Sequence, residues 1–272
     1  MNAAKTPLRH ATLVIDDGIA VFTHQRPEAR NALSPELLED YADMLDAVER
    51  DSSVRALVLM GSGGSFCAGG DLKSLKAAQA QPPDAIRRRV MNAHAWMQRL
   101  RNLEMPVIAA VDGAAIGAGF SIALAADFIV ASSRALFSLS FAKVGLVPDL
   151  GAAYILPRLV GLATAKELVL SARRIDANEA KRLGIVYAIH APDRLAEETT
   201  AFARRFVAGP REAMGFSKRL LNMSFESPYA LLAELEGATQ ALASSLPYHA
   251  ASIAAFLDGQ SAPYDWDRQP GV

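Results

Sequence analysis

Asp149 is a carboxylate in an otherwise apolar stretch of the segment GLVPDLGAAYILPRLVG, residues 145–161. Charged side chains avoid apolar surroundings unless they are paired or hydrogen-bonded. One interpretation is a helix N-cap, because a helix is predicted for the residues that follow. The other is a general base in an apolar pocket, where desolvation would raise the pKa of the carboxyl group.

Two glycine-rich loops could supply hydrogen-bond donors. The segments GSGGSFCAGGD (61–71) and DGAAIGAGFS (112–121) each follow a predicted buried strand. Glycine lets backbone N–H groups approach a ligand, and two such donors at one point form an oxyanion hole, worth about 3 to 4 kcal/mol per donor in a transition state. Neither loop contains a nucleotide-binding pattern, G-x-x-x-x-G-K-[ST] or G-x-G-x-x-G. A tight turn without a ligand remains the alternative for each loop.

The other reactive side chains form no recognisable site. The five histidines are scattered without H-x-x-x-H spacing, and Cys67 is the single cysteine, so no metal site is expected. Ser34, Ser65 and Ser121 lack the G-x-S-x-G pattern of a nucleophilic serine. A net charge of −1 gives no long-range attraction to nucleic acid or to an anionic membrane.

Hydrophobic patterning predicts the elements that must position these residues. A hairpin is expected over 11–25 around the turn Asp17–Gly18, and a helix over 31–50 with Ser34 as its N-cap. Further strands are predicted at 54–60, 107–111, 127–132 and 135–139, and a further helix at 84–103.

The pattern becomes helical from residue 193 almost to the end of the chain. We therefore expect an α/β fold, with a core at 1–191 and a helical C-terminal region at 192–272. The apolar window 106–126 is long enough to cross a bilayer, but it contains Asp112 and three glycines, so we expect a buried strand, a glycine turn and a buried helix instead.

The single cysteine and the N-terminal segment bear on location. One cysteine cannot form an intramolecular disulfide, which fits a reducing compartment. The segment MNAAKTPLRHATL has no apolar stretch of the kind found in signal peptides. We therefore expect a cytoplasmic protein.

Four segments, in order, carry a resemblance to a known family. They are RPEARNALS (26–34), GSFCAGGDLK (64–73), MPVIAAVDGAAIGAGFSIALAADFIVAS (105–132) and FAKVGLVPDLGAAYILPRLVG (141–161). Together they resemble the enoyl-CoA hydratase/isomerase (crotonase) superfamily over roughly residues 11–260. The resemblance implies a spiral of ββα units with a helical C-terminal region that forms homotrimers or dimers of trimers. It also implies an acyl-CoA substrate and no separate cofactor.

The resemblance further implies which residues hold the substrate. The thioester oxygen would lie between the N–H groups of Ala68 and Ala118, where Ala118 departs from the glycine common at that position. The coenzyme A nucleotide would lie near Arg30 and along Ala68, Gly69, Gly70 and Asp71. The acyl pocket would include Ser121 and the apolar side chains of Leu139, Phe141, Leu146 and Leu150.

The side chains at the reacting positions decide between reactions within the family. Hydratases of this superfamily use two glutamates, which would fall at Ser121 and Phe141, and both are missing here. Asp149 looks like the carboxylate of the isomerase branch, which includes the 1,2-epoxyphenylacetyl-CoA isomerase type. One carboxylate in a dry pocket is enough there, because it takes a proton from C2 of a 3-enoyl-CoA and returns it at C4.

Three alternatives remain open at this point. The chain could be a hydratase that activates water with a non-standard group. In a reaction resembling that of 4-chlorobenzoyl-CoA dehalogenase, Asp149 would attack an aromatic ring and His94 would activate water, although Phe141 replaces the tryptophan expected there. A non-catalytic binding or assembly subunit of the same fold is the third.

Overall fold

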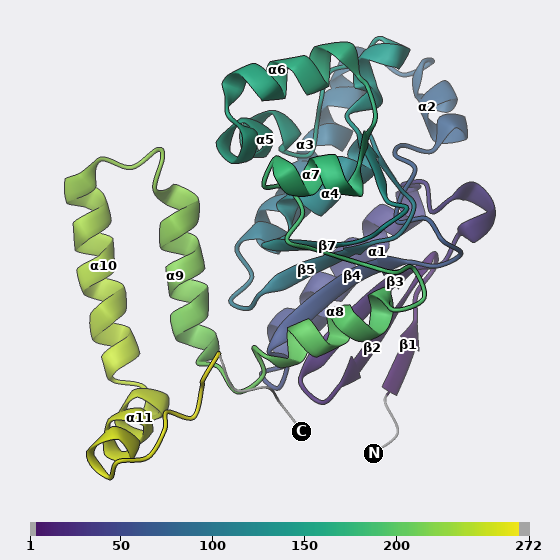
Figure 1. The fold of residues 1–272 in the computed structure, drawn as a ribbon. Coiled ribbons are helices and arrows are strands. Elements are labelled where there is room, and N and C mark those ends of the chain that lie inside the picture. Colours follow the sequence, from purple (N-terminus) through teal and green to yellow (C-terminus); the bar gives the residue numbers. More distant parts are fainter. Residues whose placement is uncertain (1–3, 267–272) are drawn as a thin grey trace.

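A seven-stranded sheet forms the centre of the protein in the computed structural model, which describes residues 4–266 (Figure 1). The strand order is β1-β2-β3-β4-β5-β7-β10, antiparallel from β1 to β3 and parallel from β3 to β10. A second sheet of three short strands has the order β6-β8-β9. The mixed α/β architecture expected from the sequence is therefore confirmed.

The strands have the following bounds: Ala4–Pro7 (β1), Ala11–Asp16 (β2), Ile19–His24 (β3), Ala56–Gly61 (β4), Val107–Val111 (β5), Ala114–Ile116 (β6), Phe128–Ser132 (β7), Leu136–Ser138 (β8), Ile175–Asp176 (β9) and Ala188–His190 (β10). The predicted hairpin is present as β2 and β3, with Asp17 and Gly18 in the turn, both at positive φ.

The helices have the following bounds: Pro35–Arg50 (α1), Leu72–Ala78 (α2), Pro83–Arg101 (α3), Ala118–Ala125 (α4), Ala152–Val160 (α5), Leu162–Ser171 (α6), Ala177–Arg182 (α7), Leu195–Arg204 (α8), Arg211–Met223 (α9), Tyr229–Ser244 (α10) and Pro247–Leu257 (α11). Ser34 is the N-cap of α1, as predicted, and its side chain accepts a hydrogen bond from the N–H of Leu37.

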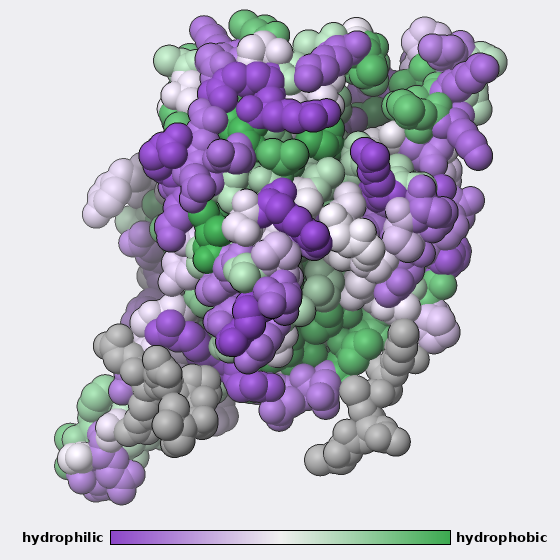
Figure 2. All heavy atoms as spheres, turned by 45° about the vertical axis from the view of Figure 1, so that its right-hand side comes forward, coloured by the Kyte–Doolittle hydropathy of each residue, from purple (hydrophilic) through white to green (hydrophobic). Residues whose placement is uncertain are grey.

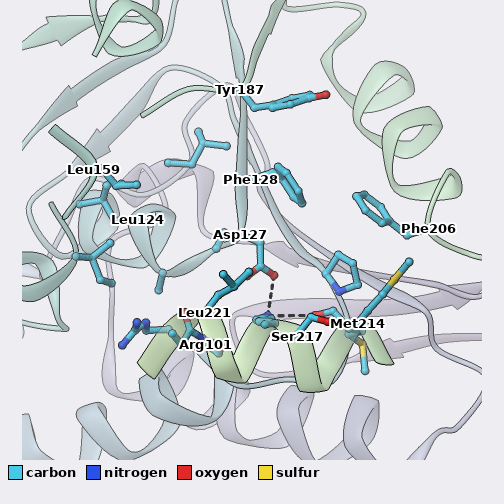
Figure 3. Close-up of a pocket in the computed structure, with 18 of the residues that line it drawn as sticks. Arg101, Leu124, Asp127, Phe128, Leu159, Tyr187, Phe206, Met214, Ser217 and Leu221 are labelled. Carbon is cyan, nitrogen blue, oxygen red and sulfur yellow. Dashed lines mark hydrogen bonds and ion pairs between the residues drawn. The ribbon is translucent and has the colours of Figure 1, made fainter. Parts of the chain in front are cut away.

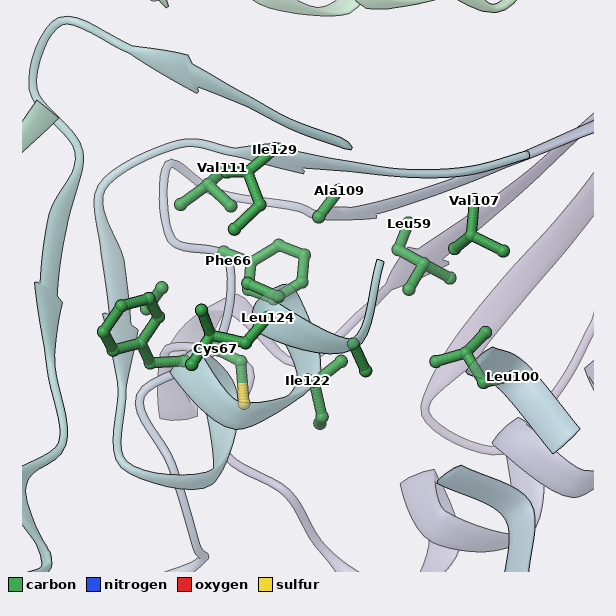
Figure 4. Close-up of a cluster of buried hydrophobic side chains, with 14 of the residues drawn as sticks. Leu59, Phe66, Cys67, Leu100, Val107, Ala109, Val111, Ile122, Leu124 and Ile129 are labelled. Carbon is green, nitrogen blue, oxygen red and sulfur yellow. The ribbon is translucent and has the colours of Figure 1, made fainter. Parts of the chain in front are cut away.

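The central parallel strands are buried on both faces, and successive side chains go to different cores. In β4, Leu57 and Leu59 pack in the larger core with α1, α3 and α4, whereas Ala56 and Val58 pack against α8. This alternation follows from the two-residue period of a strand. Figure 4 shows the larger core beneath the first glycine loop. Phe66 and Cys67 of that loop lie there among apolar side chains such as Leu59, Ala109 and Ile122.

The apolar window 106–126 folds as a buried strand, a turn and a buried helix, as expected from its glycines. It contains β5, β6 and α4, and every residue of α4 is buried. No helix among the described residues is long and apolar enough to cross a membrane. Figure 2 shows charged and polar side chains interrupting the apolar ones over the face that it displays.

The C-terminal region separates into two parts. Helix α8 packs on the sheet, with Leu195 and Ala203 buried against β4, β5 and β7. Helices α9, α10 and α11, here called the C-terminal arm, extend from that body, with α10 on the side of α9 away from the sheet (Figure 1). None of the described residues of α10 or α11 is buried. The domain boundary at residue 192 stays a prediction.

A buried polar group lies inside the larger core. His24, at the end of β3, is fully buried between the carbonyl of Phe66 and the hydroxyl of Tyr41. Desolvation lowers the pKa of His24 from its ordinary 6.5 to about 4. The ring is therefore neutral in the folded protein at neutral pH.

This shifted pKa predicts a pH dependence of stability. Above about pH 6.5 the ring is neutral in both states. As the pH falls from 6.5 towards 4, the unfolded chain takes up a proton that the folded chain does not, so the free energy of unfolding should decrease by about 3 kcal/mol from this group. Urea unfolding at several pH values, compared with a His24→Asn variant, measures the contribution. Equal pH slopes for the two proteins would contradict it.

Candidate active site

The two glycine loops meet backbone to backbone at the carboxyl ends of β4 and β5. Cys67 N–H donates to the carbonyl of Ala114 at 2.9 Å, and Ile116 N–H donates back to the carbonyl of Cys67 at 3.0 Å. A Cβ on Gly119 would lie 2.2 Å from the carbonyl oxygen of Cys67, closer than any real contact. Only glycine permits this approach, which explains why the loops are rich in it.

The first loop corrects the expected role of Ala68. Its N–H donates to the carbonyl of Arg30 at 3.0 Å, so the prediction of a free donor there is wrong. On either side of Gly70, the Gly69 C=O and the Asp71 N–H both pair with Leu33, at 2.8 and 3.2 Å. This pairing turns Gly70 away from Leu33, and its N–H has no acceptor in the described part of the chain. Gly70 is therefore the free donor of this loop.

Ala118 N–H begins α4 and also lacks an acceptor within the described residues. The first N–H groups of a helix have no partner within it, and they carry the positive end of the helix dipole. A Cβ on Gly69 would lie 3.8 Å from the nitrogen of Ala118 and 2.7 Å from the carbonyl oxygen of Ile116. The free donor of the second loop thus lies beside the residue that precedes Gly70.

The sequence analysis missed Asn31, which holds the 26–31 turn against the first loop. Its buried Nδ2 donates to the carbonyls of Ser62 and Ser65, at 2.9 and 2.6 Å, and its Oδ1 accepts from Arg26 N–H at 2.8 Å. Its φ is +54°, a conformation that asparagine tolerates better than most residues. An asparagine after the turn-forming Pro27 was the available signal.

The predicted coenzyme A residues differ in what they can offer. Arg30 lies in this turn and is exposed. The carboxylate of Asp71 is the N-cap of α2, accepting from the N–H groups of Lys73 and Ser74 at 3.0 Å each, and it pairs with Arg26 at 3.2 Å. The hydrogen bond from Ser74 and the nearby guanidinium hold the pKa of Asp71 below its ordinary value, although burial opposes this. The carboxylate oxygens of Asp71 are thus already engaged in hydrogen bonds within the protein.

Asp149 is not a helix N-cap. The N-cap of α5 is Gly151, and Oδ1 of Asp149 is buried without a hydrogen-bond partner in the described part of the chain. Burial raises the pKa of Asp149, while the charges of His94 and Arg89 on α3 oppose that rise. An unpaired carboxylate oxygen whose proton affinity is increased by desolvation fits a group that accepts and releases a proton.

The apolar residues expected around Asp149 are buried, with one exception. Leu139, Phe141 and Leu150 are buried, and Leu150 has a φ of +51°. Leu146 is 49% exposed, so this chain alone does not give it the drying role expected of it. Gly145 ends the preceding 3-10 helix in a left-handed conformation, and Leu146 follows it directly. The hydrophobic pattern of the sequence does not show this change in chain direction.

Ser121 is also buried, and its hydroxyl donates to the carbonyl of Gly117 at 3.3 Å within its own helix. The segment that leads to Asp149 starts beside this helix, because Gly117 N–H donates to the carbonyl of Ser138 at 2.8 Å. Helix α4 also packs against α5, which follows Asp149. The fold thus brings the carboxylate segment to the second glycine loop.

A large cavity lies elsewhere, at the amino-terminal ends of β5 and β7. It has a volume of about 970 Å³ and is lined by residues such as Pro106 and Asp127, which precede β5 and β7, and by Lys218 of α9 (Figure 3). Lys218 pairs with Asp127 at 2.7 Å and donates to the carbonyl of Met105 at 3.1 Å. None of the predicted site residues lines this cavity. We therefore assign the site by the glycine loops and Asp149.

No group of three potential metal ligands occurs among residues 4–266. Cys67 is buried, and burial raises the pKa of its thiol to about 11, so it is a poor nucleophile. The groups of this site that could act on a substrate are the carboxylate of Asp149, which could transfer a proton, and the free N–H groups of Gly70 and Ala118.

Comparisons with known proteins agree with the family resemblance found in the sequence. The model of the enoyl-CoA hydratase/isomerase family matches residues 14–265. A 1,2-epoxyphenylacetyl-CoA isomerase of Escherichia coli (strain K12) is 32% identical over 92% of this chain and 96% of its own. A short-chain-enoyl-CoA hydratase of Clostridium acetobutylicum is 34% identical over 80% of this chain and 83% of its own.

Solved structures extend the agreement to the fold. The crystal structure of an enoyl-CoA hydratase/isomerase from Cupriavidus metallidurans CH34 matches with a TM-score of 0.92 and 37% identity, covering 98% of this chain and 99% of that one. The expected fold, with its ββα units, is thereby confirmed. The similar proteins carry both the hydratase and the isomerase names.

The contact between the loops predicts a cost for a single methyl group. In Gly119→Ala the new Cβ would overlap the carbonyl of Cys67, so the free energy of unfolding should decrease by at least about 2 kcal/mol. Gly237→Ala is the matched control, because Gly237 lies in α10 with nothing near its Cβ position, and alanine there should stabilise by up to about 1 kcal/mol. Chemical denaturation measures both. Equal effects would show that the loops do not touch as described.

Proposed function

The chain belongs to the enoyl-CoA hydratase/isomerase family, and we propose that it moves the carbon–carbon double bond of a 3-enoyl-CoA to the 2-position. The observation that carries this proposal is the half-buried carboxylate of Asp149, whose Oδ1 is buried without a hydrogen-bond partner among the described residues. One group that both accepts and returns a proton suffices for such an isomerisation.

The proposed steps use three groups of the chain. The carboxylate of Asp149 removes a proton from C2, and the electron pair moves to the thioester oxygen. The N–H groups of Gly70 and Ala118 stabilise that oxyanion, each by about 3 kcal/mol in the transition state. The protonated Asp149 then returns its proton at C4, and the pair of electrons comes back to form the 2,3 double bond.

The surroundings of Asp149 favour isomerisation over hydration. Hydration needs a second group that activates water. The hydroxyl of Ser121 is engaged with the carbonyl of Gly117, and the side chain of Phe141 is apolar. A pocket that includes the buried side chains of Leu139, Phe141 and Leu150 would also keep water from the dienolate.

The position of His94 near Asp149 favours a reaction with water. His94 is partly exposed on α3 and is near enough to Asp149 to act on the pKa of that carboxyl group. A hydratase that used His94 as a non-standard base is therefore the second candidate.

We further propose that the functional unit is a homo-oligomer assembled through the C-terminal arm. Large apolar side chains of the arm are exposed, among them Tyr229 (85%), Phe256 (62%) and Leu257 (83%). Apolar surface of this kind marks an interface. A trimer, or a dimer of trimers, would bury it.

The proposed reaction needs no cofactor, since the coenzyme A thioester is itself the substrate. A cytoplasmic location is part of the proposal and is supported by the single, buried cysteine.

Replacing the proposed acid–base group tests the proposal. In Asp149→Asn, turnover of a 3-enoyl-CoA should fall by about 10³-fold or more, because the amide cannot accept the C2 proton. Affinity for the product 2-enoyl-CoA, measured by calorimetry, should change little. Ser121→Ala is the matched control and should lose much less activity. Unchanged turnover in Asp149→Asn would exclude Asp149 as the base.

The raised pKa of Asp149 predicts the acid side of the pH–rate profile. Only the ionised carboxylate can remove the proton, so kcat/KM should fall as the pH decreases through the pKa of Asp149 in the free enzyme. Because burial raises that pKa, the fall should occur above the ordinary aspartate value of 3.8. Initial rates at a series of pH values measure it, and a profile that stays flat down to pH 4 would contradict it.

A further inference from the structure

His24 lies directly beneath the first glycine loop. Its Nδ1 is 2.9 Å from the carbonyl oxygen of Phe66, and its Nε2 is 2.8 Å from the hydroxyl of Tyr41. A carbonyl oxygen only accepts hydrogen bonds, so Nδ1 must carry the proton. In a neutral ring Nε2 then accepts from the Tyr41 hydroxyl. Both ring nitrogens and the carbonyl are thereby satisfied in a fully buried place.

The peptide group between Phe66 and Cys67 is held at both ends. His24 holds its carbonyl, and the N–H at the other end donates to Ala114 of the second loop at 2.9 Å. A trans peptide is planar, with its C=O and N–H pointing in opposite directions. Fixing the carbonyl therefore also fixes the direction of the N–H that joins the two loops.

The preceding carbonyl is held in a similar way. Ser65 C=O accepts from Asn31, and a Cβ on Gly61 would lie 2.1 Å from that oxygen and 2.6 Å from the oxygen of Phe66. Both carbonyls thus turn inward over the end of β4. Losing the donor at His24 would leave the Phe66 carbonyl buried and unpaired, which favours rotation of that peptide.

His24 is also connected, through Tyr41, to the helix α3. The ring of Tyr41 on α1 stacks on that of Trp96 on α3, with centroids 4.5 Å apart and an interplanar angle of 18°. Helix α3 carries His94 and Arg89, whose charges act on Asp149. His24, Tyr41 and Trp96 therefore connect the donor loop with the other side of the site.

We propose that His24 is a positioning residue for the oxyanion-binding loop: its Nδ1–H sets the peptide that joins the two loops, and so the separation of the Gly70 and Ala118 N–H groups. This inference rests on the proposed function, in which Gly70 and Ala118 polarise the thioester. A displacement of a donor by about 1 Å can cost about 10²-fold in rate.

Two variants at this position separate a positioning role from a merely structural one. His24→Leu removes the donor, whereas His24→Asn can place an amide N–H at the same point along the side chain as Nδ1. Turnover of a 3-enoyl-CoA should fall about 10²-fold in His24→Leu, in kcat more than in KM, and should be largely restored in His24→Asn. Leu195→Ala, on the buried face of α8, is the control for lost stability alone and should keep its kcat.

A spectroscopic probe reports on the donors themselves. Cinnamoyl-CoA is a conjugated thioester, and hydrogen bonds to its carbonyl shift its absorbance to longer wavelength. The wild-type protein and His24→Asn should show this shift, and folded His24→Leu should lose most of it. A folded His24→Leu that keeps both its kcat and the shift would overturn the inference. A wild-type protein that binds cinnamoyl-CoA without any shift would instead overturn the proposed function.

A measurement on the wild-type protein covers the case in which His24→Leu does not fold. Nitrogen-15 NMR of the histidine rings should show one ring with a slowly exchanging proton on Nδ1 that does not titrate between pH 8 and pH 5. If no ring shows that protonated Nδ1, the bond to Phe66 does not exist and the inference fails.

Discussion

The contact between the backbones of the two glycine loops is the constraint on which the site depends. A Cβ at Gly119 would overlap the carbonyl of Cys67, and one at Gly69 would overlap the carbonyl of Ile116. Because neither position has a side chain, two N–H donors from separate loops lie close together. Their closeness is the condition for stabilising one oxygen from two sides.

The sheet and the buried polar side chains make that contact possible. Strands β4 and β5 are parallel neighbours, so the loops that follow them leave the same edge of the sheet. Asn31 and His24 then hold consecutive carbonyls of the first loop from below. The donors are thus fixed before a substrate arrives, which is what makes electrostatic stabilisation effective. Asp149 completes the arrangement with a group whose proton affinity is raised by burial.

Much of this could be predicted from the sequence, because strand periodicity, glycine runs and a lone carboxylate in an apolar segment are local signals. The burial of Leu139 and Phe141 was expected only from the family resemblance. The prediction that Ala68 supplies the free N–H donor is wrong, because a positive φ of 95° at Gly69 redirects the chain. Only the pairing with Leu33 shows that the N–H of Gly70 is the one left free. His24 and Asn31 were missed because their partners lie 42 and 34 residues away, beyond any local pattern.

The most direct test of the account is the fate of two substrates in D₂O, followed by mass spectrometry. The protein would be incubated with a 3-enoyl-CoA and, separately, with a 2-enoyl-CoA. A single carboxylate in a dry pocket predicts conversion of the 3-enoyl ester to the 2-enoyl ester without addition of water. Formation of a 3-hydroxyacyl-CoA from the 2-enoyl ester would contradict it, and would show that another group beside Asp149 activates water.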